Sequence, residues 1–428
     1  MSRLLRFWPF GFIAAVAVFC SLLLTRNVDL RVYWYGVTGF FHGTRPAYGP
    51  ESGLGFPMEY RYPPVTYLLL SPLYLMPLRV AGFFWMLAAW AAATAAVALA
   101  IRKRRLSFSP TAVLVSFAFL ASYLLLAVRY GNVQPFVIAF LLAALVLSES
   151  RPLCAGALLA LAVTFKIWPV LFVPWFLRRS RWHSTFYFAV CFAGLWLAPF
   201  AVFGPGRYLQ LLHDWFVAVG RVGTTYSEFY YFPGQSLRGL LLRLITPISP
   251  PLAFFPDVHV LSLSPRTAVT LWIVIGSAAY LLLITLMLRS DERKMTAWDG
   301  AVFVLYSMLE PYAVKSGLIS LGPAVLMAAA LFSVTTSRSG RRSAAKPIVW
   351  ANRLFLASCA LAFAGALIQY KSLQRWLLSV GLDFWAELLL LAAYLLWIER
   401  TTVPDQLRSV EPVVNNAETG STNYPVVG

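Results

Sequence analysis

Long apolar runs separated by short basic stretches extend along this chain to about residue 400. A helix needs about 20 predominantly apolar residues to cross a bilayer, and several of these runs reach that length. The composition agrees, because 60% of the 428 residues are hydrophobic and 12% are charged, whereas a soluble domain has about 25% charged residues. The sequence therefore predicts an all-α polytopic membrane protein.

Ten segments are predicted as single spans from their length and apolar content. They lie near residues 10–26, 79–101, 109–128, 132–148, 184–203, 267–288, 296–310, 315–334, 348–369 and 380–398. The first is predicted to be a retained helix, because its apolar stretch is long and lacks the small-residue cleavage site of a signal peptide.

Two further stretches are apolar but do not fit an ordinary span. Residues 62–77 contain four prolines, and a crossing there would place the basic run at 102–105 outside, against the positive-inside rule. They are predicted to lie at the outer interface or to dip in without crossing. Residues 156–182 are preceded by Arg151 and end in a stretch with three arginines, which predicts two short, broken helices with Lys166 and Pro169 at or near the turn. The total is about 12 crossings with both termini inside.

Much of the net charge of +18 lies in loops that this topology places in the cytoplasm. These loops contain Arg102–Arg105, Arg178–Arg181, Arg289–Lys294 and Arg338–Lys346. Because positive charge in short loops sets membrane orientation, we predict no nucleic-acid partner. The predicted organisation is one transmembrane domain over residues 1–400, with outer loops at 27–78 and 204–266, and a disordered cytoplasmic tail at 401–428.

The sequence predicts neither a metal site nor a cofactor. The four cysteines lie inside apolar runs, and the four histidines are scattered along the chain without the spacing of metal ligands. Neither a Walker-type nor a Rossmann-type glycine motif occurs, so nothing supports the binding of a soluble nucleotide.

An acidic residue stands where the first predicted span ends, in the stretch "TRNVDLRVYWYG" at residues 25–36. Asp29 could cap the helix expected at 30–42, since Asp is a preferred N-cap residue. Tyr33 lies one helical turn beyond it, and a carbohydrate site places aromatic rings beside a carboxylate. Both interpretations remain open on these residues alone.

Both predicted outer loops keep arginines on the side of the membrane that the positive-inside rule disfavours. They are Arg31, Arg45, Arg61, Arg207, Arg221, Arg238 and Arg243. A guanidinium group matches the oxygens of a phosphate, so these residues are candidate phosphate ligands. The alternative is that they contact lipid headgroups or only solvate the loops. Lys166 adds a basic residue at membrane depth or at the outer face, which indicates a functional role.

Five segments in a fixed order carry a resemblance to a known family. The first runs from the Asp29 stretch through "GTRPAY" (43–48) to "YRYPPVTYLLLSPLYLMP" (60–77). The others are "GNVQPFVIAFLLAALVL" (131–147), "GALLALAVTFKIWPVLF" (156–172), "FPGQSLRGLLLRL" (232–244) and "LEPYAVKSGLISLGPA" (309–324). Over about residues 10–335 the chain resembles glycosyltransferase family 87, whose members are polyprenyl-phosphate-mannose-dependent mannosyltransferases with the GT-C fold.

The resemblance implies roles for individual residues. Asp29 would be the general base of an inverting transfer, and a positioned base contributes about 10²–10⁴ in rate. The phosphate leaving group needs positive charge, for which the candidates are Lys166, Lys315, Arg61, Arg238 and Arg243. Hydrogen bonds to the sugar or phosphate would come from Asn132 and Gln134, although both could instead cap a span. The remaining predicted substrate-binding residues are Tyr33, Tyr62, Gln235 and Glu310.

The chain departs from the family pattern at four positions. Glu310 stands where the family has Ser, Val314 replaces a Trp, Gly317 replaces a His, and Gly234 replaces an Asn. If the missing His assists the base or binds the acceptor, Glu310 is the candidate substitute. These departures leave the identity of the sugar and of the acceptor open.

The predicted function is transfer of a sugar, mannose by resemblance, from a polyprenyl-phosphate donor to a hydroxyl of a lipid or glycan acceptor. The predicted location is the plasma (inner) membrane, among membrane lipids, with the active site on the outer face. The alternative is a transporter or flippase for a charged lipid or a lipid-linked sugar. A non-catalytic scaffold would leave the ordered outer motifs unexplained.

Overall fold

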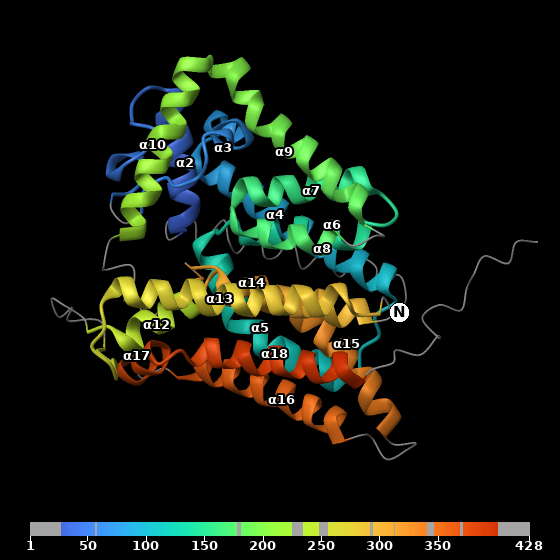
Figure 1. The fold of residues 1–428 in the computed structure, drawn as a ribbon. Helices are drawn as coiled ribbons and strands as arrows, with labels where there is room; N and C mark the ends of the chain where they lie inside the picture. Colours follow the sequence, from blue (N-terminus) through green and yellow to red (C-terminus); the bar gives the residue numbers. More distant parts are fainter. Residues whose placement is uncertain are drawn as a thin grey trace, which may run out of the picture.

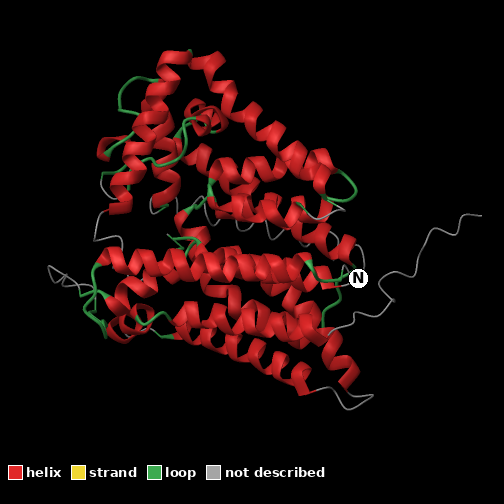
Figure 2. Cartoon of the chain, in the orientation of Figure 1, coloured by secondary structure: helices red, strands yellow, loops and turns green. Residues whose placement is uncertain are grey.

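The computed structural model describes residues 27–55, 58–177, 181–224, 234–247, 256–291, 294–311, 313–339, 346–368 and 371–400. Over this part of the chain the ordered elements are helices, and the β-type pairing is a single isolated bridge between Gly234 and Val314 (Figure 2). The all-α prediction is therefore confirmed. The predicted first span at 10–26 and the predicted tail at 401–428 lie outside the described residues.

The helices follow one another along the chain (Figure 1). They are α2 (Val28–Phe41), η2 (Pro50–Ser52), α3 (Val65–Leu69), η3 (Ser71–Leu75), α4 (Leu78–Arg104), α5 (Pro110–Tyr130), α6 (Gln134–Leu147), α7 (Pro152–Phe165), η4 (Trp168–Phe172), α8 (Val173–Phe176), α9 (Trp182–Phe203), α10 (Pro205–Thr224), α12 (Leu237–Ile245), α13 (Pro265–Leu288), α14 (Met295–Leu309), η6 (Leu318–Leu321), α15 (Gly322–Ser339), α16 (Lys346–Leu367), α17 (Lys371–Ser379) and α18 (Leu382–Arg400).

Among the described residues, six helices are long and apolar enough to cross a membrane. They are α4, α5, α9, α13, α16 and the segment Leu318–Ser337. A seventh is obtained if α17 and α18, which meet at an angle of 49°, form one broken span. Three further apolar helices, α6, α7 and α14, are shorter. The chain is thus a polytopic membrane protein, and the number of about 12 crossings stays a prediction.

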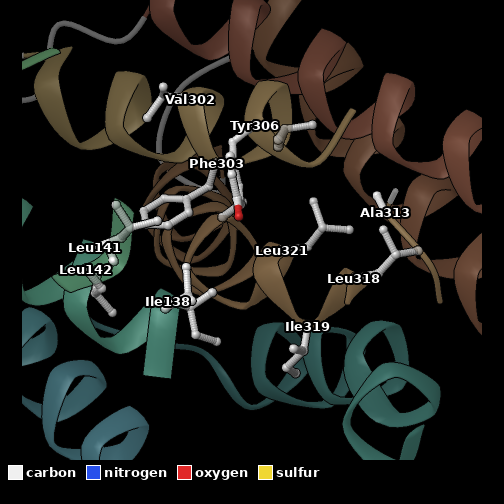
Figure 3. Close-up of a cluster of buried hydrophobic side chains, with 14 of the residues drawn as sticks. Ile138, Leu141, Leu142, Val302, Phe303, Tyr306, Ala313, Leu318, Ile319 and Leu321 are labelled. Atoms are coloured by element: carbon white, nitrogen blue, oxygen red, sulfur yellow. The ribbon is translucent and has the colours of Figure 1, made fainter. Parts of the chain in front are cut away.

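The core of the molecule surrounds α14. Every residue of this helix from Ala297 to Leu309 is buried, as expected for a helix that is apolar on all sides and lies among other helices. It packs against α15, α18 and η6. Figure 3 shows the contact region, where side chains of α6, α14 and η6 gather; it includes Ile138, Leu141, Phe303, Tyr306 and Leu318. In contrast, α9 lies at the periphery and exposes most of its apolar surface.

Residues 62–77 form two short helices, α3 and η3, in place of a span. Proline limits both, because it cannot donate the backbone hydrogen bond that continues a helix. This agrees with the prediction that the segment does not cross. Stacked aromatic rings hold it together: Tyr67 lies 4.1 Å from Phe40 and 4.6 Å from Tyr60 between ring centroids. The amphipathic helix α10 contacts the residue that precedes this segment, because Trp215 Nε1 donates to Arg61 O at 3.0 Å.

A buried cluster of charges joins the predicted cytoplasmic ends of several helices. The Asp299 carboxylate, near the start of α14, lies 2.9 Å from Arg104 at the end of α4 and 3.4 Å from Arg181. Trp175 Nε1 donates to the same carboxylate at 3.0 Å. Arg181 also lies 3.3 Å from Glu149, just beyond α6. Arg104 and Arg181 belong to two basic stretches that are predicted to lie on the same side of the membrane, and both contact the carboxylate of Asp299.

Candidate active site

Asp29 lies in the first turn of α2 and does not cap it. The N-cap position belongs to Asn27, whose side chain makes no capping hydrogen bond. The Asp29 carboxylate instead reaches across to the connection between α5 and α6, where its Oδ2 accepts a hydrogen bond from Asn132 Nδ2 at 2.8 Å. The capping interpretation is therefore wrong, and the acid is held by a residue 103 positions away in sequence.

The connection that carries Asn132 begins with a glycine that its geometry requires. Gly131 ends α5 in the left-handed conformation, at φ 65°, where non-glycine residues are strained. A Cβ at this position would lie 2.9 Å from Leu30 Cβ in α2. Trp85 Nε1 fixes the Gly131 carbonyl with a hydrogen bond of 3.1 Å. The glycine thus lets the connection approach α2 closely enough for Asn132 to reach Asp29.

The orientation of the Asn132 amide follows from its second hydrogen bond. The backbone N–H of Gln134 donates to Asn132 Oδ1 at 2.8 Å, so the oxygen of the amide faces α6. The NH₂ group must then point toward Asp29, which fits its role as a donor to the carboxylate. Asn132 therefore both begins the turn into α6 and holds one oxygen of Asp29.

Tyr33 and Tyr62 tie the first outer segment to the same connection. The Tyr62 hydroxyl donates to the Tyr33 hydroxyl at 2.9 Å, and the Val133 N–H donates to the Tyr33 hydroxyl at 3.3 Å. The two rings meet edge to face with centroids 5.1 Å apart. Their predicted contact with substrate is untested, but these bonds position the helix that carries Asp29.

Lys166 and Glu310 lie beside this group, and each directly follows the end of a helix. The helix α7 ends at Phe165, and Lys166 follows in an extended conformation, as the predicted break requires. Glu310 follows the last residue of α14 and precedes Pro311. Lys166 Nζ lies 2.8 Å from Glu310 Oε1, with side chains 20% and 4% exposed.

Gln134 connects α6 to the same helix end. Its Nε2 donates to the Tyr306 hydroxyl at 3.4 Å, and Tyr306 lies one turn before Glu310 on α14. The ends of α6, α7 and α14 therefore meet at one place, and each brings a polar residue to it.

Burial raises the pKa of the Asp29 carboxyl to about 6. The hydrogen bond from Asn132 and the positive charge of Lys166 oppose this shift, and they are smaller influences than burial. A carboxyl with such a pKa is anionic at neutral pH and basic enough to take a proton, which is the condition for a general base.

Gln235 and Arg243 contact the end of α17. Gln235 Nε2 donates to Leu378 O at 2.9 Å, and Arg243 Nε donates to Ser379 O at 2.8 Å. Backbone carbonyls at the end of a helix lack partners within the helix, and these side chains supply donors. The two residues hold the bend between α17 and α18, which accounts for their burial without a substrate.

Lys315 belongs to a second buried group. Its Nζ lies 3.7 Å from Asp383 Oδ2 at the start of α18, and the Tyr123 hydroxyl donates to Asp383 Oδ1 at 2.9 Å. The cation of Lys315 is thus balanced within the protein. The structure does not bring it into the hydrogen-bond network of Asp29.

Arg61 and Arg238, the other two arginines predicted to bind the leaving group, lie at different places. Arg61 Nε is 4.0 Å from the Glu59 carboxylate. The Arg238 guanidinium lies 5.6 Å from the centre of the Trp272 ring, and Trp272 contacts Trp168 with ring centroids 6.1 Å apart. Because Trp168 is two residues after Lys166, Arg238 is connected to the Lys166 region through two aromatic rings.

Three residues that build the site were not predicted from the sequence. Trp85 and Gly131 position the connection that carries Asn132, and Tyr306 links Gln134 to α14. Gly131 could have been recognised from the sequence, because it stands between an apolar run and a polar pair. Trp85 and Tyr306 lie inside apolar runs, and nothing in such a run separates a positioning residue from a core residue.

Two comparisons with known proteins find similar sequences. Residues 60–261 match the family model of glycosyltransferase family 87. The chain is similar to a polyprenol-phosphate-mannose-dependent alpha-(1-2)-phosphatidylinositol pentamannoside mannosyltransferase of Mycolicibacterium smegmatis, with 28% identity over 230 residues, or 51% of this chain and 52% of that protein. The chain thus matches about half the length of this relative. No solved structure matches it. Asn132 and Lys166 lie within the matched residues, and Asp29 and Glu310 lie outside them.

Proposed function

We propose that this chain, residues 60–261 of which match the family model of glycosyltransferase family 87, transfers a hexose from a polyprenyl-phosphate donor to an acceptor hydroxyl, with inversion. Mannose is the proposed sugar, because the similar mycobacterial protein is a polyprenol-phosphate-mannose-dependent mannosyltransferase. The acceptor class is a lipid or a glycan.

The observation that carries this proposal is the Asp29 carboxylate held by Asn132, with a pKa of about 6, close to the Lys166–Glu310 pair. A base and a cation in one place are what transfer from a sugar phosphate requires, because one group takes a proton while the other receives negative charge. We assign Oδ1 of Asp29 to the acceptor hydroxyl, since Asn132 is bonded to Oδ2.

The proposed step moves one proton and exchanges one bond. The acceptor hydroxyl gives its proton to Asp29 as its oxygen bonds to the anomeric carbon from the face opposite the phosphate. The bond between that carbon and the phosphate oxygen breaks, and its electron pair leaves with the polyprenyl phosphate. Lys166 would stabilise the developing charge. Attack from the opposite face inverts the anomeric configuration.

The proposed location of the site is the outer face of the inner membrane. The Arg104–Arg181–Asp299 cluster lies at the predicted cytoplasmic ends of the helices, where the positive-inside rule places arginines. Asn132, Lys166 and Glu310 lie at the opposite ends of α6, α7 and α14. This arrangement supports an outward-facing site.

A donor panel tests the reaction class. The full chain, purified in lipid, is given labelled mannose, glucose or arabinose as the polyprenyl phosphate, and each sugar also as its nucleotide derivative. We expect transfer from a polyprenyl-phosphate sugar, with mannose the best. Transfer from the nucleotide sugars alone would contradict the proposal, and movement of the intact lipid-linked sugar across vesicles without transfer would favour a flippase.

The pH dependence of the transfer should report Asp29. Since the base must be ionised, we expect kcat/KM to fall as the pH drops through about 6 and to level off above it. Replacing Asn132 by Ala removes a hydrogen bond that lowers the pKa of Asp29, so the acidic limb should move to higher pH. The measurement is kcat/KM from pH 4.5 to 8.5, and a limb unchanged in Asn132→Ala would show that another group titrates.

A further inference from the structure

We propose that Glu310 is an internal counter-ion that occupies Lys166 in the absence of donor and that the donor phosphate displaces. The inference rests on the proposed function and assigns Glu310 a competing role, distinct from direct contact with the substrate. It follows from the geometry at the ends of α7 and α14 and from the balance of charge between the residues that follow them.

The two partners differ in how freely they can move. Glu310 is 4% exposed and is fixed between the last turn of α14 and Pro311. Lys166 is 20% exposed and follows the end of α7 in extended backbone. A lysine carries its ammonium on a flexible four-carbon stem with three rotatable donors. Lys166 is therefore the member that can turn from the carboxylate to a ligand while Glu310 stays in place.

The charge balance of the site favours such an exchange. The site holds two carboxyl groups, those of Asp29 and Glu310, beside the single ammonium group of Lys166. A phosphate that approaches this group meets a cation already paired at 2.8 Å. The phosphate and Glu310 then compete for the Lys166 ammonium, because a carboxylate and a phosphate bind the same donors.

The competition between Glu310 and phosphate for Lys166 favours release of the polyprenyl phosphate product. The donor is a phosphodiester with one negative charge, whereas the released polyprenyl phosphate is a monoester that carries more charge at neutral pH. The carboxylate repels the more charged species more strongly, and Lys166 can return to it as the product leaves. Glu310 thus weakens binding of the product and resets the site.

The test compares Glu310→Gln with the wild-type full chain in lipid nanodiscs. The probes are a polyprenyl monophosphate and the uncharged polyprenol of the same length. Glutamine keeps the size and a hydrogen-bond acceptor for Lys166 but removes the charge. We expect the affinity for the monophosphate to rise about tenfold, as loss of a charged competitor for a hydrogen bond allows, and the affinity for polyprenol to stay the same. Product inhibition should strengthen by a similar factor.

A matched control is Glu149→Gln, which removes a carboxylate paired with Arg181 at the other end of the helices. It should change neither affinity. Unchanged or weaker binding of the monophosphate by folded Glu310→Gln would overturn the inference, and so would an equal gain for polyprenol. If the wild type transfers sugar but Glu310→Gln gains no affinity, the inference alone fails. If the wild type transfers no sugar from any polyprenyl phosphate, the proposed function fails.

Discussion

Asp29→Asn is expected to lower the rate of sugar transfer by about 10²–10⁴, the usual contribution of a positioned general base. The amide has nearly the same shape as the carboxylate but cannot take a proton at neutral pH. Its oxygen can still accept the hydrogen bond from Asn132. The measurement is turnover of a polyprenyl-phosphate sugar by the purified variant in lipid.

Folding of this variant should be unaffected, because the substitution removes a charge whose burial is unfavourable, as the raised pKa of Asp29 indicates. The midpoint of thermal unfolding should therefore be at least that of the wild type. Asp214→Asn is the matched control, since Asp214 lies on α10 beside His213 and is substantially exposed. It should retain full turnover. A fully active Asp29→Asn enzyme would show that Asp29 is not the base.

Asp299→Ala is expected to destabilise the protein by about 3–5 kcal/mol, the range for breaking a buried ion pair from one side. Asp299 accepts hydrogen bonds from Arg104, Arg181 and Trp175, and the Arg181 side chain is fully buried. Without the acid, Arg181 keeps only the contact with Glu149 among the residues that the structure describes. Thermal unfolding in detergent and the yield of monodisperse protein measure the effect.

Glu149→Gln separates this effect from the general loss of a charge. Glu149 contacts the same arginine, but its side chain is 55% exposed, and exposed ion pairs contribute about 0–1 kcal/mol. We therefore expect a small change in stability from Glu149→Gln and a large one from Asp299→Ala. Equal unfolding temperatures for Asp299→Ala and the wild type would show that the cluster does not stabilise the helix ends.

The breaks in the membrane-spanning pattern were predictable from local chemistry. Prolines within 62–77 indicated short helices in place of a span, and α3 and η3 are short helices. Arginines before 156–182 and at its end indicated a turn near Lys166, where α7 ends. In both cases the decisive information is the position of a proline or a charge within an apolar run, and this information is contained in the sequence.

Partners of the polar residues were not predictable in the same way. Asp29 and Asn132 were both singled out, but they are 103 positions apart and meet only because Gly131 admits a close approach between α2 and the connection after α5. Lys166 and Glu310 are 144 positions apart. Their pairing depends on the ends of two helices coming to the same place, which periodicity and charge do not specify.

Arg243 shows why retained arginines are an ambiguous signal. Its predicted position on the disfavoured side of the membrane suggested a phosphate ligand. In the structure its guanidinium donates hydrogen bonds to the carbonyls of Gly234 and Ser379. A helix end that lacks hydrogen-bond partners attracts the same donors as a phosphate. The sequence gives no indication of which acceptor is nearby.

The three helices that end at the site are short for a membrane. With 14 or 15 residues each, α6, α7 and α14 are about 21–23 Å long at a rise of 1.5 Å per residue, while the hydrocarbon layer is about 30 Å thick. If the ends of these helices that are remote from the site lie at the cytoplasmic surface, the reacting groups lie several ångströms below the outer surface of the hydrocarbon layer. A lipid-anchored donor then reaches them without leaving the bilayer, whereas a hydrophilic acceptor must descend to them. The thickness of the surrounding bilayer thereby becomes a determinant of which acceptors can react.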